Sequence, residues 1–406
     1  MSFVVFATPF FDEKTLRFMA ATLAQPGVRL AVISQASELE MPEAMRARIV
    51  DHVRVEDVLR SDEIIAAAAH LARLHEPIHR LLAINENIQV QAAEARARLD
   101  IEGLRPEAAQ RFRDKALMKE TFRAGGVPCA RHRQVTSAAE AFDFASEIGF
   151  PVIIKPLSGA GAADTHRATD TESLRTALAA SAPSANHPVL VEEFIVGHEH
   201  SFETITVAGQ PVWHSITRYF PNPLEVVQTP WIQWCVVLPR EVDDPAYDDI
   251  RAHGARALSV LGMDTGLSHM EWFRRRDGSV AISEVGARPP GAQFCTIISR
   301  AHDFDLYEAW ARLVLGGSFE PPVRKYAAGA AYLRGQGEGV VRAIHGLDQI
   351  DREIGHLITD VKLPEIGKPH ATGYEGDGYI LLRHPETSVV EEALLRLVSL
   401  VRVELG

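Results

Sequence analysis

Apolar runs of strand length alternate with amphipathic segments over the first hundred residues of the chain. The apolar runs are residues 3–7, 29–34 and 80–84, and helical patterning covers residues 13–23 and 56–74. Strands that alternate with helices usually pair side by side in a parallel sheet. We therefore expect residues 1–110 to form a small parallel α/β domain.

The pattern becomes more varied after residue 110. Helical patterning covers residues 110–123, 252–261 and 304–315, apolar strands cover 149–156 and 189–195, and a hairpin covers 201–217. We expect these elements to form a central domain over residues 111–322. The segment after Pro321-Pro322 has short glycine-rich strands and one helix, which predict a small α+β domain over residues 323–406.

Two apolar runs of the central part each carry one carboxylate, Glu271 in the first and Glu284 in the second. The turn between the runs ends in Asp277-Gly278. An Asp-Gly pair between apolar runs is the strongest local signal of a β-hairpin, and this hairpin would hold the two glutamates side by side. Adjacent carboxylates repel each other unless a hard cation lies between them. We therefore expect Mg²⁺ at this position, with Mn²⁺ as a substitute.

Two lysines upstream are candidates for binding phosphate. Lys155 ends an apolar strand, and residues 158–163 after it are all small, so their backbone N–H groups can approach a phosphate closely. A lysine that reaches solvent beside a flexible loop is an equally good interpretation. Lys115 is the second candidate, although a lysine on a helix is more often a solvated surface residue.

The acidic strand end Glu192-Glu193 also has two interpretations. Backbone groups of Glu193 and Ile195 can pair with the edge of an adenine, and Glu199 can accept hydrogen bonds from ribose hydroxyls. Surface decoration is the more frequent role of an acidic pair at a strand end. Arg288, just beyond the second hairpin glutamate, can bind a carboxylate or a phosphate through two hydrogen bonds.

The order of these signals along the chain resembles the ATP-grasp superfamily. A lysine, a strand lysine with a glycine loop, the run Glu-Glu-Phe-Ile-Val-Gly-His-Glu, and two glutamates followed by an arginine occur in this order between residues 113 and 291. The resemblance covers most of the chain and is strongest to the carboxylate–amine ligases, including amino-acid ligases. It implies an ATP-grasp fold preceded by a small parallel α/β (pre-ATP-grasp) domain and followed by a small α+β C-terminal domain.

The resemblance also implies a role for each candidate residue. Lys115 and Lys155 would hold the α- and β-phosphates of ATP, and Glu271 and Glu284 would hold magnesium. Arg288 would face the substrate carboxylate or its phosphate and, with Lys155, would be catalytic. Contacts to the phosphates and to adenosine would come from Ser158, Gly159, Ala160, Gly161, Glu192, Glu193, Ile195 and Glu199.

The reaction that the resemblance implies is ATP-dependent ligation of a carboxylate and an amine. An acyl phosphate would form first, and its capture by the amine would give an amide or peptide bond with release of ADP and phosphate. A lid over about residues 127–185 would exclude water from the acyl phosphate. The alternatives are a biotin-carboxylase-like or purine-pathway ATP-grasp enzyme, and a non-catalytic nucleotide-binding sensor.

The chain departs from the family at Gly286, where an asparagine usually helps to bind a second magnesium. Because glycine has no side chain, the number of metal ions stays open. We expect the substrates to be a small carboxylate and a small amine, in particular amino acids. His269 and Arg218 are further candidate substrate contacts, although a structural role for His269 fits the sequence equally well.

Composition excludes some other classes of function. The formal net charge of −12 argues against a general nucleic-acid binder, and no apolar run approaches the roughly 18 residues of a membrane span. Three scattered cysteines and the lack of a signal-peptide pattern predict a soluble cytoplasmic protein. A homodimer is compatible with the sequence, since two-fold dimers are the commonest oligomers of soluble proteins.

Overall fold

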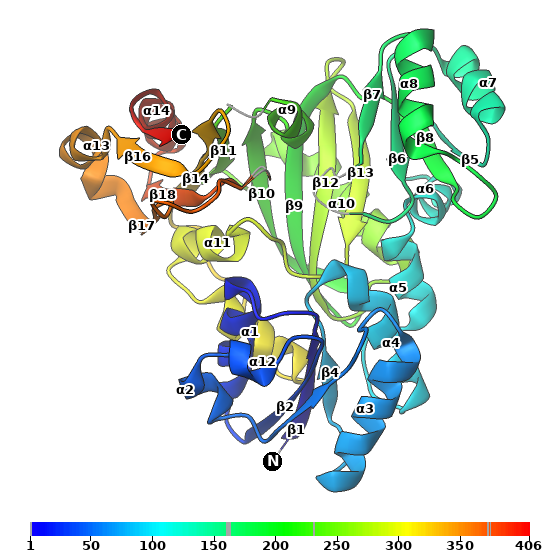
Figure 1. Cartoon of the computed structure of the whole chain (residues 1–406), viewed down its shortest axis with the longest axis vertical. Helices are drawn as coiled ribbons and strands as arrows, with labels where there is room; N and C mark the ends of the chain where they lie inside the picture. The colour runs from blue at the N-terminus through cyan, green and yellow to red at the C-terminus, as the bar shows by residue number, and fades with distance from the viewer. Residues whose placement is uncertain (1, 160–163, 230–231, 372, 374) are drawn as a thin grey trace.

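The computed structural model describes all residues except 1, 160–163, 230–231, 372 and 374 (Figure 1). Its N-terminal part is a four-stranded parallel sheet in the order β3-β2-β1-β4, which confirms the predicted parallel α/β arrangement. The strands are β1 (Ser2–Thr8), β2 (Val28–Ser34), β3 (Asp51–Arg54) and β4 (Arg80–Leu82). The helices are α1 (Glu13–Leu23), α2 (Glu43–Arg46), α3 (Ser61–Leu74) and α4 (Gln89–Arg98). The sequence pattern did not predict β3, whose side chains are at most partly buried.

The helical pattern over residues 110–123 forms two helices rather than one. α5 (Pro106–Arg113) and α6 (Lys115–Ala124) are separated at Asp114, whose backbone is extended. The Asp114 carboxylate accepts hydrogen bonds from two N–H groups in the first turn of α6 and so caps that helix. Lys115 is therefore the first residue of α6 rather than a residue in the middle of a longer helix.

A small antiparallel sheet follows, in the order β5-β8-β6-β7, and two helices pack against it. The strands are β5 (His132–Val135), β6 (Val152–Pro156), β7 (His166–Ala168) and β8 (Val189–Glu193). The helices are α7 (Ala138–Ile148) and α8 (Thr171–Ser181). Most of the segment predicted to form a lid belongs to this sheet and its helices, which lie at the upper right of Figure 1.

The largest sheet has eight strands in the order β13-β12-β9-β10-β11-β14-β18-β17, and every neighbouring pair is antiparallel. The first five strands in chain order are β9 (Gly197–Val207), β10 (Gln210–Phe220), β11 (Trp234–Leu238), β12 (Gly266–Arg275) and β13 (Val280–Gly286). The last three are β14 (Ala327–Leu333), β17 (Ile358–Lys362) and β18 (Gly378–His384). Strands from beyond residue 322 therefore continue the sheet of the central part, and the domain boundary at that residue stays a prediction.

The C-terminal part adds a three-stranded sheet in the order β15-β19-β16. Its strands are β15 (Gly335–Gln336), β16 (Val341–His345) and β19 (Arg402–Leu405), and its helices are α13 (Leu347–Ile354) and α14 (Thr387–Leu400). α14 packs closely on β14, where a Cβ at Gly329 would lie 2.7 Å from Leu394 Cδ1. Strands and helices are thus mixed in this segment, as predicted for an α+β arrangement.

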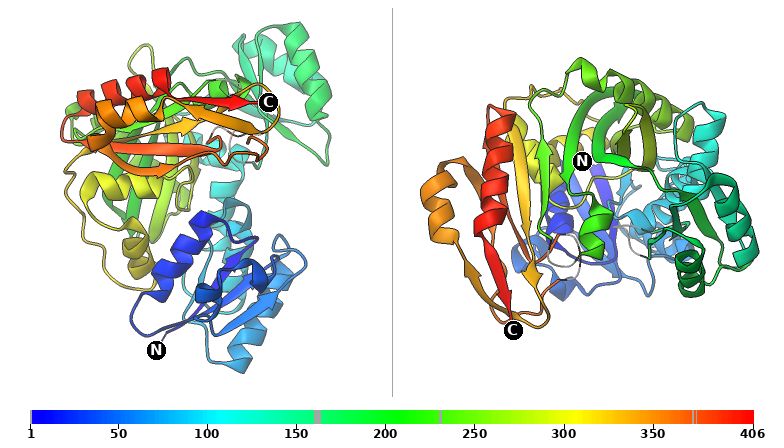
Figure 2. Two further views of the ribbon diagram at one scale, coloured as in Figure 1. Left: turned by 60° about the vertical axis from the view of Figure 1, so that its left-hand side comes forward. Right: turned by 90° about the horizontal axis from the view of Figure 1, so that it is seen from above.

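Four more helices complete the central part: α9 (Pro223–Gln228), α10 (Asp248–Leu261), α11 (Phe294–His302) and α12 (Leu306–Val314). One hydrophobic core joins the N-terminal domain to the large sheet through α11 and α12, which lie between them in Figures 1 and 2. At its centre Phe18 of α1 packs against Tyr307 and Trp310, with ring centroids 4.8 Å apart in both pairs. Among the described residues no helix is long and apolar enough to cross a membrane.

Candidate active site

The predicted hairpin is formed by β12 and β13, and Glu271 lies directly opposite Glu284 in its register. Asp277 closes the turn by accepting hydrogen bonds from the backbone N–H and the hydroxyl of Ser279. Gly278 takes a positive φ of 85°, which a side chain rarely tolerates. The turn sets the register from Arg274 to Trp272, and a shift of one residue between Trp272 and Glu271 then brings Glu271 opposite Glu284 rather than Ser283.

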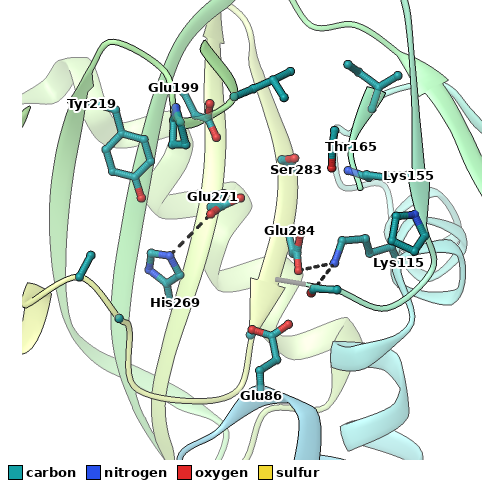
Figure 3. Close-up of a pocket in the computed structure, with 18 of the residues that line it drawn as sticks. Glu86, Lys115, Lys155, Thr165, Glu199, Tyr219, His269, Glu271, Ser283 and Glu284 are labelled. Atoms are coloured by element: carbon teal, nitrogen blue, oxygen red, sulfur yellow. Dashed lines mark hydrogen bonds and ion pairs between the residues drawn. The ribbon is translucent and has the colours of Figure 1, made fainter. Parts of the chain in front are cut away.

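The two glutamates line a pocket of about 570 Å³ that most of the predicted site residues share (Figure 3). The predicted residues in its wall are Lys115, Lys155, Gly159, Glu192, Glu193, Ile195, Glu199, His269, Glu271, Glu284 and Arg288. Ser158 and Arg218 are not part of the wall. Ala160 and Gly161 lie outside the described residues.

Lys115 connects α6, the loop after β6 and the hairpin. Its Nζ lies 2.7 Å from Glu284 Oε1 and donates a hydrogen bond of 3.2 Å to the carbonyl of Gly159. Its backbone N–H donates to the carbonyl of Leu157. The lysine is 6% exposed, so the interpretation of it as a solvated surface residue is wrong.

Lys155 forms an ion pair with Glu192. The same carboxylate also pairs with Lys119, a second lysine that the sequence analysis missed. Lys155 Nζ lies 2.5 Å from Glu192 Oε1, and Lys119 Nζ lies 3.0 Å from Glu192 Oε2. Burial by itself raises the pKa of the Glu192 carboxyl, but the two ammonium groups lower that pKa to about 2. Lys119 follows Lys115 by one helical turn on α6, so the spacing of the two lysines was an available signal.

This geometry changes the interpretation of Glu192. Its carboxylate is directed at the two lysines, so the side chain fixes the ammonium of Lys155 and leaves adenosine to other groups. Lys119 is 1% exposed and also donates to the carbonyl of Ser283 on β13. The triad therefore ties α6, the small sheet and the large sheet together at the edge of the pocket.

The carboxylates on the large sheet are less well neutralised. Burial, with the nearby charge of Glu284, raises the pKa of Glu271. Burial, with the charge of Glu271, raises the pKa of Glu199 well above its ordinary value. Since both shifts come from desolvation and like charges, a cation bound among these groups would relieve both.

Part of the pocket wall is apolar. Ile153, Phe194, Ile195 and Phe273 contribute to it. The Glu193 carboxylate is not free, because it lies 2.6 Å from Arg275 Nη1 and 3.3 Å from Arg131 Nε. It therefore links the small sheet to β12.

Arg288 meets a carboxylate from the N-terminal domain that the sequence analysis also missed. Glu86 Oε2 accepts from Arg288 Nε at 2.8 Å and from Nη2 at 2.5 Å, and Arg113 Nη1 lies 3.4 Å from Glu86 Oε1. Burial raises the pKa of Glu86, but the charges of Arg288 and Lys115 outweigh it and lower that pKa. Glu86 follows β4 at the carboxyl end of a parallel strand, where ligand-binding groups commonly gather.

His269 lines the pocket, as expected for a substrate contact, and has a buried partner. Its Nδ1 lies 2.8 Å from Oε1 of Glu203, which is fully buried, and its Nε2 lies 3.9 Å from Glu271 Oε1. Near the hairpin end, a Cβ on Gly286 would lie 3.4 Å from Arg288 Cγ and 3.7 Å from Glu86 Oε2. The place of the usual asparagine is therefore next to the Arg288–Glu86 pair.

Arg218 does not fit its predicted role as a substrate contact. Its guanidinium donates to the Tyr247 hydroxyl and to Glu391 of α14, away from the pocket. Its neighbour Tyr219 lines the pocket instead. Successive residues of a strand point to opposite faces of the sheet. Tyr219 therefore faces the pocket, and Arg218 points to the other face of β10.

Parts of the chain are similar to known proteins. The model of the carbamoyl-phosphate synthase L chain ATP-binding domain matches residues 114–208. The uncharacterized protein y4rH of Sinorhizobium fredii is 25% identical over 83% of this chain and 69% of its own length. A D-alanine–D-alanine ligase of Geobacillus thermodenitrificans is 27% identical over 43% of this chain, which spans 50% of the ligase.

The fold has a counterpart over its whole length. The crystal structure of an L-amino acid ligase from Bacillus licheniformis matches with a TM-score of 0.81 and 18% identity, over 100% of this chain and 99% of that chain. The match extends from the N-terminal parallel sheet to the C-terminal strands. The chain therefore has the fold of that L-amino acid ligase, and its residues 114–208 resemble the ATP-binding domain of the carbamoyl-phosphate synthase L chain.

Proposed function

We propose that the protein is an ATP-dependent ligase that joins the carboxylate of one amino acid to the amine of another, with release of ADP and phosphate. The observation that carries the proposal is the pairing of Glu271 with Glu284 across a hairpin, in one pocket with Lys115, Lys155 and Arg288. The ligases among the similar proteins support the same class of reaction. Two-fold homodimerisation and a cytoplasmic location, where free thiols persist, belong to the proposal as expectations.

The nucleotide is proposed to lie in the pocket with its base against the apolar residues and its phosphates towards the two lysines. Ile195 and Phe273 offer apolar contacts for the base, and backbone groups of Glu193 and Ile195 are suited to its polar edge. Glu199 is buried and lies opposite Phe273 of β12, so it would meet the ribose hydroxyls. Lys115 and Lys155 are the cations that would meet the α- and β-phosphates.

Glu271 and Glu284 fit a magnesium ion. They are adjacent carboxylates that face one pocket, and the pKa of Glu271 is raised by burial and by Glu284. Mg²⁺ in nucleotide sites is commonly held by one or two carboxylates, with phosphate oxygens and water as its other ligands. When bound, the ion neutralises charge on the transferred phosphoryl group, and Mn²⁺ can take the same ligands. Gly286 adds no ligand, so we propose one protein-held metal position rather than two.

The chain's own residues would orient the substrates, balance the phosphate charges and exclude water. Arg288 can hold the substrate carboxylate through two hydrogen bonds while one carboxylate oxygen forms the bond to the γ-phosphorus and ADP leaves. The amine nitrogen then bonds to the acyl carbon, and the bond between that carbon and the phosphate oxygen breaks. Phosphate leaves with that oxygen and the electron pair, and the amine proton passes to solvent. The ammonium groups of Lys115 and Lys155 would balance the negative oxygens. The Glu193 ion pairs link the small sheet to β12 and would help to hold it closed over the acyl phosphate.

A second candidate function has one observation in its favour. The matched family model describes a carbamoyl-phosphate synthase domain, and a bicarbonate-activating enzyme would use the same ATP site. In that case bicarbonate would replace the amino-acid carboxylate. The experiment below separates the two functions.

The test is phosphate release from ATP and Mg²⁺ with pairs of amino acids, with the ligated product identified by mass spectrometry. We expect release that depends on both amino acids and yields one dipeptide per phosphate. Release that depends on bicarbonate instead would favour the second candidate. No stimulation by any carboxylate and amine pair would refute the ligase.

A pair of variants tests the metal carboxylate. Glu284→Gln should lower turnover by about a hundredfold or more, because a charge that stabilises the transferred phosphoryl group is lost. The matched control is Glu172→Gln on the exposed surface of α8, where the side chain is 79% exposed. The control should behave like the unaltered protein, and near-normal turnover of the Glu284 variant would refute the metal assignment.

A further inference from the structure

A second pocket, of about 260 Å³, lies at the junction of the N-terminal domain with the central part of the chain. Its walls come from β4 and α4 on one side, from residues 263–267 and 287–289 on another, and from the end of α12. It shares Arg288 with the proposed active site. A water molecule takes up about 30 Å³ of liquid volume, so the space is large enough for a small molecule.

Arg96 faces this pocket from α4. The residue is 8% exposed, and its Nε donates a hydrogen bond of 2.8 Å to the carbonyl of Leu81. Throughout the described part of the chain, no carboxylate lies within ion-pair distance of the guanidinium, and Nη1 and Nη2 have no acceptor. A guanidinium has five N–H donors, so four remain for something inside the pocket.

The charge of Arg96 persists in this setting. Burial lowers its pKa to about 10, so the side chain stays protonated near neutral pH. Glu102 in the same wall is already paired with Arg80 at 2.8 Å. Asp264 is exposed at the rim and makes no ion pair with Arg96. Buried cations are normally matched by an anion, and no protein group in this pocket fills that role.

The loop after α4 is shaped around the arginine stem. A Cβ on Gly103 would lie 2.8 Å from Arg96 Cδ, and Gly103 has a φ of +145°. A side chain at this position would displace the stem and strain the backbone. Gly103 therefore leaves room for the side chain of Arg96, a buried cation that no carboxylate of the described residues balances.

We propose that Arg96 binds a small oxyanion, a phosphate or a carboxylate, in this pocket. The guanidinium fork suits two oxygens of such an anion. An anion here would also contact residues 287–289, which carry Arg288. It would thereby join the N-terminal domain to the segment that holds a proposed catalytic residue. This site is distinct from the ATP site and does not depend on the reaction proposed above.

The test is calorimetric titration of the whole protein with inorganic phosphate and, separately, with acetate, at constant ionic strength. Saturating MgADP is present so that the lysines of the ATP site are occupied. We expect one of the two anions to bind with a dissociation constant of about 10 mM or tighter, and the two titrations identify whether phosphate or carboxylate is preferred. The absence of binding by both anions over that range would overturn the proposal.

Arg96→Met should weaken the binding at least about tenfold, while Arg98→Met should leave it unchanged. Arg98 is the matched control because it lies two residues away on α4 and is exposed. Equal affinities in all three proteins would overturn the proposal. Should the Met variant not fold, Arg96→Lys keeps the charge but not the fork and should bind more weakly. Selenate located by anomalous scattering beside Arg96 would support the site, and selenate found only elsewhere would contradict it.

Discussion

Lys119 offers a sharp test of how the lysines of the active site are held. Its ammonium is buried against Glu192 Oε2 at 3.0 Å, while Lys155 lies against the other oxygen. Lys119→Met keeps the length and most of the volume of the side chain but removes one of the two cations. We expect the variant to be less stable and to bind ATP more weakly, because Lys155 alone must then neutralise Glu192.

The magnitude follows from the carboxyl group. Lowering the pKa of Glu192 from its ordinary 4.5 to about 2 corresponds to about 3 kcal/mol of stabilisation of the charged form. Two lysines share this effect, and the hydrogen bond from Lys119 to the carbonyl of Ser283 is lost as well. The variant should therefore unfold with a free energy about 2 kcal/mol lower than that of the unaltered protein.

The sign of the pH dependence is fixed by the direction of the shift. A carboxyl whose pKa is lowered by folding contributes stability above its unfolded pKa and loses it as the pH falls through its folded pKa. The difference in the free energy of unfolding between the variant and the unaltered protein should be constant above about pH 5 and shrink between about pH 4.5 and 2. In Lys119→Met the pKa of Glu192 should move back towards 4.5.

The assay is urea unfolding, followed by tryptophan fluorescence at several pH values, together with calorimetric titration of ATP. The control is Lys325→Met, because Lys325 pairs with Asp303 at 3.3 Å on the surface and is 52% exposed. Exposed pairs contribute at most about 1 kcal/mol, so the control should change little. Equal free energies of unfolding for Lys119→Met and the control, or an unchanged affinity of Lys119→Met for ATP, would refute the reasoning.

Two further predictions concern residues that the sequence analysis missed or misjudged. Glu86→Gln should leave the protein folded but raise the KM for the acid substrate and lower kcat by roughly tenfold, because Arg288 loses the charge that orients it. Unchanged values of KM and kcat would show that Glu86 has no positioning role. Arg218→Met should lower the melting temperature through the lost contacts with Tyr247 and Glu391, yet leave both KM values within about twofold; a large rise in either KM would return Arg218 to the substrate site.

Local patterns predicted the elements but not all of their boundaries and neighbours. The hairpin was predictable because Asp277-Gly278 fixes the turn between two apolar runs, but the register shift next to Glu271 that sets it opposite Glu284 was not. The break at Asp114 was not, because an aspartate that caps a helix lies here inside a continuous helical pattern. Pairing between β11 and β14 was also beyond local reasoning, since some 90 residues separate Val237 from its partner Gly329.

The same limit applies to the active site. The presence of Lys155, Glu271, Glu284 and Arg288 in one pocket could be predicted because each has a pattern around it, whereas Lys115 was predicted only through the order of the signals along the chain. Glu86 could not, since only the fold brings the end of β4 to Arg288. The contacts of Glu192 with Lys119 and of Glu193 with Arg275 were unpredictable for the same reason, although the helical spacing of Lys119 from Lys115 did indicate that the two lysines share a helix face.

The ion pairs inside the pocket indicate how ligand charges would be accommodated. Lys115 neutralises Glu284 at 2.7 Å, and Glu86 neutralises Arg288 at 2.5 Å. When the Lys115–Glu284 pair separates, a metal ion would bind Glu284 and a phosphate would bind Lys115. Neither protein charge would then be left unbalanced in a buried site. The substrate carboxylate would share Arg288 with Glu86 in the same manner. Among the described residues the ammonium of Lys155 pairs with Glu192 alone, and its remaining N–H donors would face the phosphates without losing that partner. The pocket can therefore exchange internal pairs for ligand pairs at little electrostatic cost, which favours a site that binds and releases a highly charged nucleotide in every turnover.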